Sequence, residues 1–205
     1  MKKIFVIFAT FFSLNILPIF ANTQTIGAGL SVPVQYLQFS EQSGFGTNYD
    51  LDVQYRFFEE TGPAYYFDLA LGIGANDLFK DYEKEMVTFF HFGMFIGYGY
   101  DLLKSVKGAK LVASGILGFE SNNSTYKQGS LFSHKKVSQE NFNINAGLDL
   151  YFCKSITSSL GIFLDVKGYA GFGASTLEEK NTDIEDRKFY YTFAAVPSLG
   201  CAWKF

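Results

Sequence analysis

The chain has 205 residues, of which 48% are hydrophobic and 19% aromatic, with 24 Phe, 13 Tyr and 20 Gly but only 4 Pro. Its formal net charge of −3 provides no basic surface for a nucleic-acid partner, so we expect none. The aromatic content exceeds what the core of a soluble domain of this size needs, and it is typical of the aromatic girdles of membrane barrels.

A secretory signal peptide is predicted over residues 1–21. Two lysines precede an apolar run, and the small residue Ala21 closes it. The run is too short and too interrupted for a membrane-spanning helix, which needs about 20 predominantly apolar residues. We therefore expect an exported mature domain over residues 22–205, and the loss of the two lysines changes its net charge from −3 to −5.

Beyond the signal, apolar and polar residues alternate with a period of two, which is the pattern of strands with one apolar face. Tyr49 and Leu51, for example, alternate with Asp50 and Asp52. Each strand is near the length of about 9 to 11 residues that a tilted strand needs to cross a bilayer. The predicted strands cover residues 26–36, 48–57, 65–74, 89–100, 111–120, 141–153, 160–173 and 189–205. Both faces of the fifth strand are apolar up to Glu120, so the sequence does not fix its orientation.

The connections between these strands alternate in length. Those after the second, fourth and sixth strands are short, whereas those after the third, fifth and seventh are longer and more polar. Short periplasmic turns and long outer loops are the asymmetry of an outer-membrane barrel. The pattern predicts an all-β fold, an eight-stranded antiparallel up-and-down transmembrane β-barrel with both termini periplasmic. The long connections are expected over residues 76–85, 121–140 and 175–188.

A secreted eight-stranded barrel of the lipocalin kind is the main alternative. In such a barrel the apolar residues would face inward and the polar residues would face water. The alternation by itself does not exclude this arrangement, so the asymmetry of the connections and the carboxyl terminus have to discriminate.

The carboxyl-terminal strand carries an aromatic face. In a soluble protein this face would lie on an exposed edge strand, where aggregation is the usual result. Ser198, Gly200, Trp203 and the terminal Phe205 resemble the terminal assembly signal of bacterial outer-membrane β-barrels.

Over its mature length the chain resembles small eight-stranded outer-membrane barrels of the OmpX, OmpW and OmpA-domain kind. The resemblance rests on the signal, the strands and the terminal motif, and it matches no functional site. It implies residence in the cell outer membrane, contact with outer-membrane lipids and insertion by the barrel-assembly machinery; we expect a monomer. We rank a surface-exposed, non-enzymatic barrel first, with a role in adhesion, host interaction or envelope integrity. A narrow channel for small hydrophobic or ionic solutes with a lateral opening ranks second, and a lipid-modifying enzyme third.

On the membrane interpretation, the ionisable side chains of the polar faces point into the lumen. Eight strands enclose a space that side chains roughly fill, so we expect paired charges that form a plug. Arg56 and Lys167 are expected at its centre, with Asp68, Asp149 and Asp165 within reach by strand order. A narrow ion path with an acidic bias is the alternative. The expected lumen residues are Asp50, Asp52, Arg56, Asp68, His91, Glu120, Asp149, Asp165, Lys167 and Lys204.

We predict no catalytic, cofactor or metal site. Outer-membrane lipid A deacylases carry a His-x-Ser pattern on a strand, and neither His91 nor His134 is followed by serine two residues later. His134 lies near Ser138 and Glu140 in a predicted loop, which is only a weak grouping for an activated nucleophile. Two separated histidines and two separated cysteines do not make a metal site.

Lys127, Lys135 and Lys136 lie in the longest predicted loop and form a candidate surface-binding site. Exposed loops on a rigid scaffold are where recognition usually occurs. These lysines are candidates for contact with lipopolysaccharide phosphates or a host polyanion.

Pro33 in the first strand and Pro197 in the last fall at similar heights if these two strands close the barrel. Neither has an amide hydrogen to donate. The pair predicts a weak closing seam that opens sideways to lipid. The alternative is that each missing donor faces no partner.

Overall fold

In the computed structural model the described residues are 23–39, 43–76, 87–128, 135–179 and 185–205. Within these ranges no helix is long and apolar enough to span a membrane. The predicted signal peptide and His134 lie outside the described residues, as does the predicted connection over residues 76–85 apart from Asn76.

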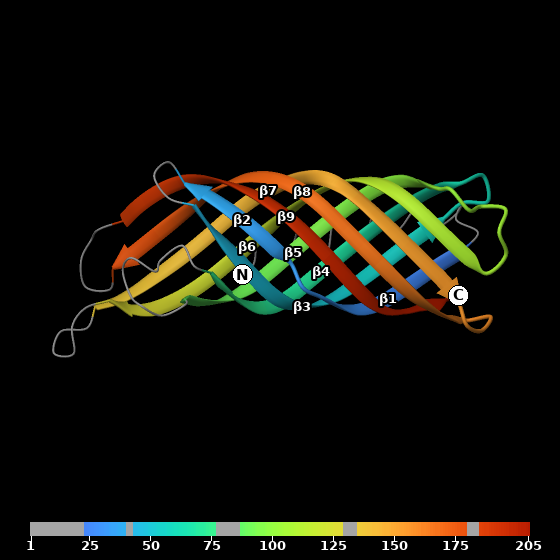
Figure 1. The fold of residues 1–205 in the computed structure, drawn as a ribbon, viewed down its shortest axis with the longest axis horizontal. Coiled ribbons are helices and arrows are strands. Elements are labelled where there is room, and N and C mark those ends of the chain that lie inside the picture. Colours follow the sequence, from blue (N-terminus) through green and yellow to red (C-terminus); the bar gives the residue numbers. More distant parts are fainter. Residues whose placement is uncertain (1–22, 40–42, 77–86, 129–134, 180–184) are drawn as a thin grey trace, which may run out of the picture.

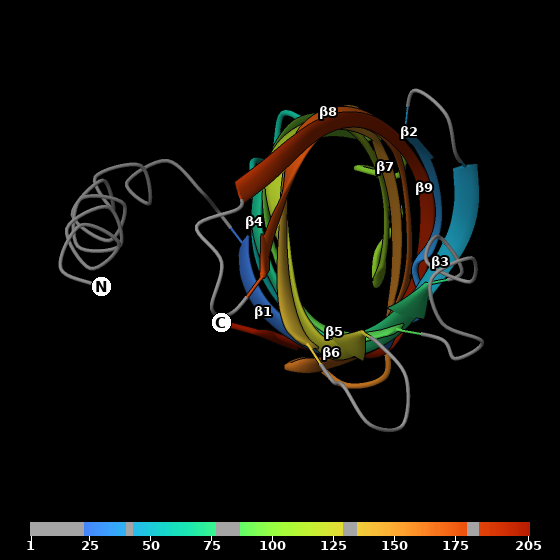
Figure 2. The ribbon, with the colours of Figure 1, turned by 90° about the vertical axis from the view of Figure 1, so that its left-hand side faces the viewer.

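The described residues form one closed antiparallel sheet, drawn along its length in Figure 1 and from its end in Figure 2. Its strands are β1 (Thr23–Ser31), β2 (Val34–Phe39), β3 (Ser43–Phe58), β4 (Pro63–Asn76), β5 (Val87–Asp101), β6 (Ala109–Gln128), β7 (Lys135–Ser155), β8 (Leu160–Glu179) and β9 (Glu185–Lys204). From β3 to β9 each strand pairs with the next, and β1 and β2 lie between β3 and β9, which closes the barrel. The predicted antiparallel up-and-down barrel is confirmed.

Together β1 and β2 occupy one of eight positions around the barrel. Both strands keep one register against β3 and one register against β9, so the interruption at Val32 and Pro33 shifts no pairing. The sequence predicts a single strand over residues 26–36, and the break follows from Pro33, which has no amide hydrogen for the ladder. The eight strands predicted from the sequence therefore correspond to the eight strand positions around the barrel, one of which β1 and β2 share.

The short turns and the carboxyl terminus share one end of the barrel, on the right in Figure 1. The turns between β3 and β4, β5 and β6, and β7 and β8 occupy residues 59–62, 102–108 and 156–159. Gly62 and Gly108 adopt positive φ angles of 116° and 76°, a backbone conformation that favours glycine. The three predicted short connections are confirmed, and we call this end the turn end.

At the opposite end, called the outer end below, the strands run farther than predicted. The strands β6 and β7 stay paired out to Gln128 and Lys135, and β8 and β9 stay paired out to Glu178. The predictions of long loops were therefore wrong for residues 121–128, 135–140, 175–179 and 185–188, and the rest of the two predicted loops lies outside the described residues. Both faces of these strand ends are polar, so the two-residue hydropathy signal disappears although the backbone ladder continues.

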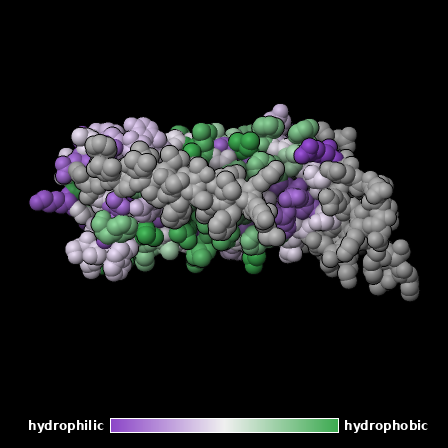
Figure 3. Space-filling view, turned by 180° about the vertical axis from the view of Figure 1, so that it is seen from behind, coloured by the Kyte–Doolittle hydropathy of each residue, from purple (hydrophilic) through white to green (hydrophobic). Residues whose placement is uncertain are grey.

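Apolar residues cover the outside of the barrel, and most of the described side chains buried inside it are polar. Tyr49 and Leu51 are 68% and 51% exposed, whereas Asp50 and Asp52 are 2% and 0% exposed. Figure 3 shows hydrophobic residues gathered along the middle of the barrel and hydrophilic residues towards its ends. In β6, whose orientation the sequence leaves open, Val112 points inward. This is the arrangement of a membrane barrel, and the lipocalin-like alternative is wrong.

Candidate functional site in the barrel lumen

The lumen is lined by charged side chains from six consecutive strands, β3 to β8. Lys204 lies near the turn end, where its ammonium donates a hydrogen bond to Ser155. The fully enclosed lumen residues are Asp50, Asp52, Arg56, Asp68, His91, Glu120, Asp149, Asp165 and Lys167. These side chains form three clusters, each around one basic group.

In the first cluster, Arg56 of β3 lies between two carboxylates. Its Nη1 donates to Asp149 Oδ2 at 3.0 Å, and its Nη2 donates to Asp165 Oδ2 at 3.2 Å. Gln54 supports both sides, because it accepts a hydrogen bond from Arg56 Nε at 3.1 Å and donates to Asp165 Oδ2 at 2.7 Å. The cluster ties β3 to β7 and β8 on the opposite wall of the barrel.

Aromatic rings pack against the Arg56 guanidinium. Its Cζ lies 4.2 Å from the ring centroid of Tyr66 and 3.8 Å from that of Tyr151. A cation over an aromatic ring is attracted by the negative face of the ring, and the attraction is larger where water is excluded. The two tyrosines therefore hold the guanidinium in place while the carboxylates fix its orientation.

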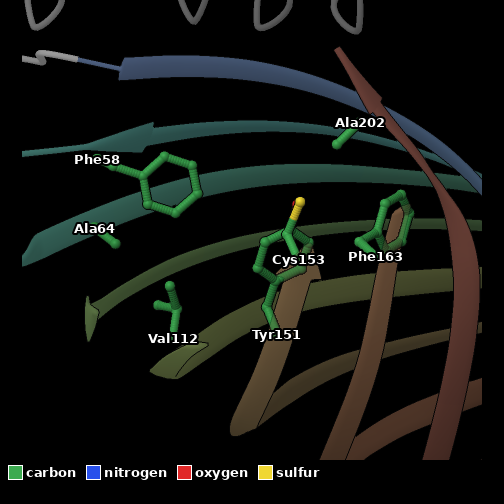
Figure 4. Packing of buried hydrophobic residues seen from close by; sticks show 7 residues of the cluster. All are labelled: Phe58, Ala64, Val112, Tyr151, Cys153, Phe163 and Ala202. Atoms are coloured by element: carbon green, nitrogen blue, oxygen red, sulfur yellow. The ribbon is translucent and has the colours of Figure 1, made fainter. Parts of the chain in front are cut away.

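Two apolar layers also lie inside the barrel. The turn-end layer comprises Phe58, Ala64, Val112, Tyr151, Cys153, Phe163 and Ala202 (Figure 4). The middle layer comprises Tyr66, Phe95, Ile116, Tyr169 and Val196. Because one tyrosine of each layer contacts Arg56, the first cluster lies between the two layers.

In the second cluster, Lys167 of β8 faces two carboxylates. Its ammonium donates a hydrogen bond to Asp68 and lies 3.9 Å from Asp52 Oδ2. The ring centroid of Phe95 is 5.5 Å from the same nitrogen. All three ionisable groups are buried, so this cluster is enclosed by the middle layer and the barrel wall.

In the third cluster, His91 of β5 lies between Asp50 and Glu120. Its Nδ1 is 2.9 Å from Asp50 Oδ2, and its Nε2 is 3.3 Å from Glu120 Oε1. Glu120 Oε2 also accepts hydrogen bonds from the side-chain amides of Asn143 at 3.0 Å and Asn145 at 2.9 Å. Glu120 is therefore the most extensively hydrogen-bonded carboxylate among these described lumen residues.

The sequence predicted that Glu120 lies in the lumen. It did not predict the neutral side chains that donate hydrogen bonds to its carboxylate. The hydroxyl of Tyr169 donates to Glu120, and Gln35 Nε2 donates to Glu120 Oε1 at 3.3 Å. These residues have the same inward orientation as the charged groups, which is the signal that the sequence offered. Contacts across the lumen depend on the register between all the strands. That register cannot be obtained from the sequence alone.

The three clusters share one composition, a single basic group between two carboxylates. They are Arg56 with Asp149 and Asp165, Lys167 with Asp52 and Asp68, and His91 with Asp50 and Glu120. Even with His91 protonated, six carboxylates face three cations. Within the described residues these clusters therefore hold twice as many carboxyl groups as basic groups.

The carboxyl-terminal motif lies at the closing seam between β1 and β9. Phe205 N donates to Gln24 O at 3.1 Å, and Gln24 N donates to Phe205 O at 3.3 Å, so the last residue still belongs to the ladder. Trp203 and Phe205 are exposed on the outer surface, whereas Ser198 is buried on the inner face. A β-carbon added at Gly200 would approach the Phe163 ring to 2.7 Å, so this position has no room for a side chain.

Protein-family models give no match to this chain, and curated protein sequences give none either. Solved structures do match. The outer membrane protein OprG from Pseudomonas aeruginosa has a TM-score of 0.59 at 10% identity, over 91% of this chain and 97% of that one. A major outer membrane protein from Thermus thermophilus has a TM-score of 0.56 at 11% identity, over 89% and 99%. The chain has the fold of the small outer-membrane β-barrels.

In this outer-membrane-type barrel, only one of the two seam prolines lacks a donor at the seam. Val32 N donates to Pro197 O at 3.1 Å, so these residues form a hydrogen-bonded pair in which Pro197 returns no bond. Asn48 N of β3 donates to Pro33 O at 3.4 Å, so the missing donor of Pro33 faces β3. The prediction that both prolines weaken the seam with β9 is therefore wrong for Pro33.

The three candidate surface lysines of the barrel lie in strands. Lys127 pairs with Lys136, and Gln128 pairs with Lys135, across the outer end of the β6–β7 hairpin. The prediction that these lysines lie in a long loop was wrong, because the polar segment continues the antiparallel ladder.

Proposed function

We propose that the chain is an integral outer-membrane barrel with a closed lumen, which acts through its outer end and catalyses no reaction. The observation that carries this proposal is the filling of the lumen by three ion clusters and two apolar layers. Buried charges held by several partners at once are costly to separate, so water and ions have no low-energy route through them.

The apolar outer surface supports membrane residence. It includes large exposed side chains on each of the strands β3 to β9, among them Ile73, Ile96, Leu117, Leu148 and Phe193. A soluble monomer rarely exposes a continuous apolar surface of this extent. The fold shared with outer-membrane proteins agrees with membrane residence. The predicted signal peptide would provide export.

The outer end is the part of the barrel available for binding. The β6–β7 hairpin and the paired ends of β8 and β9 continue past the apolar wall as polar strands. Such extensions on a rigid barrel are suited to recognition. The proposed roles are adhesion to a host surface or maintenance of the envelope, with Lys127, Lys135 and Lys136 as the polyanion-binding group.

Single cysteines test the location and orientation of the barrel. Ser138→Cys reports on the outer end and Ser158→Cys reports on the turn end, and both serines are exposed. The background variant Cys201→Ala removes the exposed native thiol, while Cys153 is buried. On intact cells a membrane-impermeant maleimide should label position 138 and leave position 158 unmodified. Labelling of both positions, or of 158 alone, would refute the proposed placement.

Planar-bilayer recording of the purified full chain tests the closed lumen. We expect no stable unitary conductance steps from the wild type. Tyr151→Ala removes one ring from the turn-end layer and from the Arg56 guanidinium, and it should introduce transient openings. Stable steps from the wild type would contradict the closed lumen and favour the ion path.

Charge removal tests the role of the outer end. Replacing Lys127, Lys135 and Lys136 together by Gln should weaken the binding of cells to heparin and of purified barrel to lipopolysaccharide vesicles. The matched control replaces Lys104 and Lys107 of the turn-end connection by Gln and should leave binding unchanged. Equal binding by both variants would remove these three lysines from the proposal.

A narrow channel with a lateral opening is the second proposal, and the Val32–Pro197 pair supports it. At this pair the seam has one backbone hydrogen bond where a regular ladder has two. Uptake of a small apolar solute into vesicles should then fall in Pro197→Ala. Uptake that does not differ from that of empty vesicles would refute the channel.

A further inference from the structure

Asp52 is the least compensated carboxylate in the described part of the lumen. Its side chain is 0% exposed, and neither carboxylate oxygen has a hydrogen-bond partner among the described residues. The nearest cation, Lys167 Nζ, is 3.9 Å away and is hydrogen-bonded to Asp68. A buried carboxylate without hydrogen bonds is costly, so a further positive group is expected beside it.

Two serine hydroxyls lie next to this carboxylate. Ser31 of β1 and Ser198 of β9 are direct register partners and are 1% and 2% exposed. The neighbouring Val32–Pro197 pair is hydrogen-bonded, so the Ser31–Ser198 pair is of the non-hydrogen-bonded type, in which side chains are closest.

Both hydroxyl groups belong to side chains that lie close to the Asp52 carboxylate. The side chains of Ser31 and Ser198 each interact favourably with Asp52, as hydroxyl donors do with a carboxylate, yet no hydrogen bond of 3.5 Å or less joins them to it. Four oxygens from three strands are thus neighbours in one buried part of the lumen: two from Asp52 and one from each serine.

The chemistry of these oxygens selects the ligand. Carboxylate and hydroxyl oxygens are hard ligands that suit hard cations. No three His, Cys, Asp or Glu side chains among the described residues are grouped to hold a metal ion, so a multi-carboxylate divalent site is not present there. Asp52, Asp68 and Lys167 together carry one negative charge when ionised, which a single monovalent cation balances.

We infer that Asp52, Ser31 and Ser198 form a binding site for one alkali-metal cation, for which Na⁺ is the probe. The cation joins β1, β3 and β9 from inside the barrel. It does so beside the Val32–Pro197 pair, where the seam lacks a backbone hydrogen bond. Binding therefore stabilises the closed seam as well as the buried carboxylate.

The resistance of the folded full chain to urea in lipid vesicles tests this site. Unfolding midpoints are measured in NaCl, KCl and choline chloride at equal ionic strength. Because a ligand that binds only the folded state stabilises it, the midpoint should rise with Na⁺ and saturate, relative to choline. Equal midpoints in all three salts would overturn the proposal and would indicate a proton or water beside Asp52.

Variants separate this site from general salt effects. Asp52→Asn, and independently Ser31→Ala with Ser198→Ala, should weaken the apparent Na⁺ affinity at least about tenfold. Asp101→Asn is the matched control, since Asp101 is a buried carboxylate paired with Lys110 at 2.8 Å near the turn end, and it should keep the Na⁺ dependence. If Asp52→Asn does not fold, the variant that combines Ser31→Ala and Ser198→Ala still tests whether Na⁺ binds at this site. Unchanged Na⁺ dependence in the serine variant would overturn the site.

A crystallographic experiment locates the ion directly. Thallium(I) substitutes for alkali-metal cations and scatters anomalously, so crystals of the full chain soaked in it should show one peak beside Asp52. A lumen peak that excludes Asp52, or no peak in the lumen, would contradict the assignment.

Discussion

The seam between β9 and the first two strands contrasts with the wall formed by β6 and β7. The wall pairs without interruption from Ala109 with Lys154 to Gln128 with Lys135. The seam consists of two shorter ladders separated at Val32 and Pro33, and Pro197 withholds one bond. Backbone pairing is therefore complete in the wall and incomplete where β9 pairs with β1 and β2.

Packing inside the barrel compensates for the incomplete seam. Phe163 of β8 lies over Gly27 and Gly29 of β1 and Gly200 of β9, so one ring covers both sides of the seam. On the outer face of the wall, a β-carbon added at Gly115 would meet nothing within 4 Å. The seam glycines face the lumen and make room for one aromatic ring, whereas Gly115 lies on the outer face of the wall. The wall glycine that faces the lumen, Gly118, likewise lies against a ring, that of Phe95.

The largest expected effect comes from filling a seam glycine. A β-carbon at Gly29 would lie 2.8 Å from the Phe163 ring and 2.8 Å from the Leu199 carbonyl oxygen, so Gly29→Leu should prevent closure. The matched variant Gly115→Leu places the same side chain on the outer face of the wall and should fold normally. The fraction of compact barrel on unheated electrophoresis gels measures the difference. Similar folding of both variants would show that the seam is no more demanding than the wall.

Removal of the covering ring should have the next largest effect. Phe163→Ala leaves a cavity in the turn-end layer, and large-to-small changes of this kind cost about 3 to 5 kcal/mol. Phe172→Ala on the exposed outer face of β8 is the control, because lipid fills the space and no cavity forms. Urea unfolding in vesicles gives both free energies. A loss for Phe172→Ala as large as that for Phe163→Ala would argue against the compensating role of the ring.

The smallest predicted effect concerns the prolines. Pro197→Ala supplies the missing donor to Val32, and one net hydrogen bond contributes about 1 kcal/mol. Amide hydrogen exchange at Val32 and its neighbours in β1 should slow. Pro33→Ala should slow exchange in β3 near Asn48 instead, because its donor faces that strand. The same exchange pattern in both variants would refute the assignment of the two missing donors.

Much of the fold follows from local patterns in the sequence. The alternation of Asp50 and Asp52 with Tyr49 and Leu51 predicts a strand with two unlike faces, and the structure has this strand. The short turns are also predictable, because Gly62 comes where the alternation stops and adopts a conformation that favours glycine. The outer strand ends were not predictable from hydropathy, since polar residues occupy both of their faces.

The sequence by itself determined the strands, their two faces and the set of side chains on the polar face, because a period of two is a local property of the chain. Only the tertiary structure decided that the polar face turns inward, since closure is a property of the whole sheet. It also decided that Arg56, Lys167 and His91 each meet two carboxylates. Those contacts cross the lumen, and their partners depend on the summed register of all the strands between them.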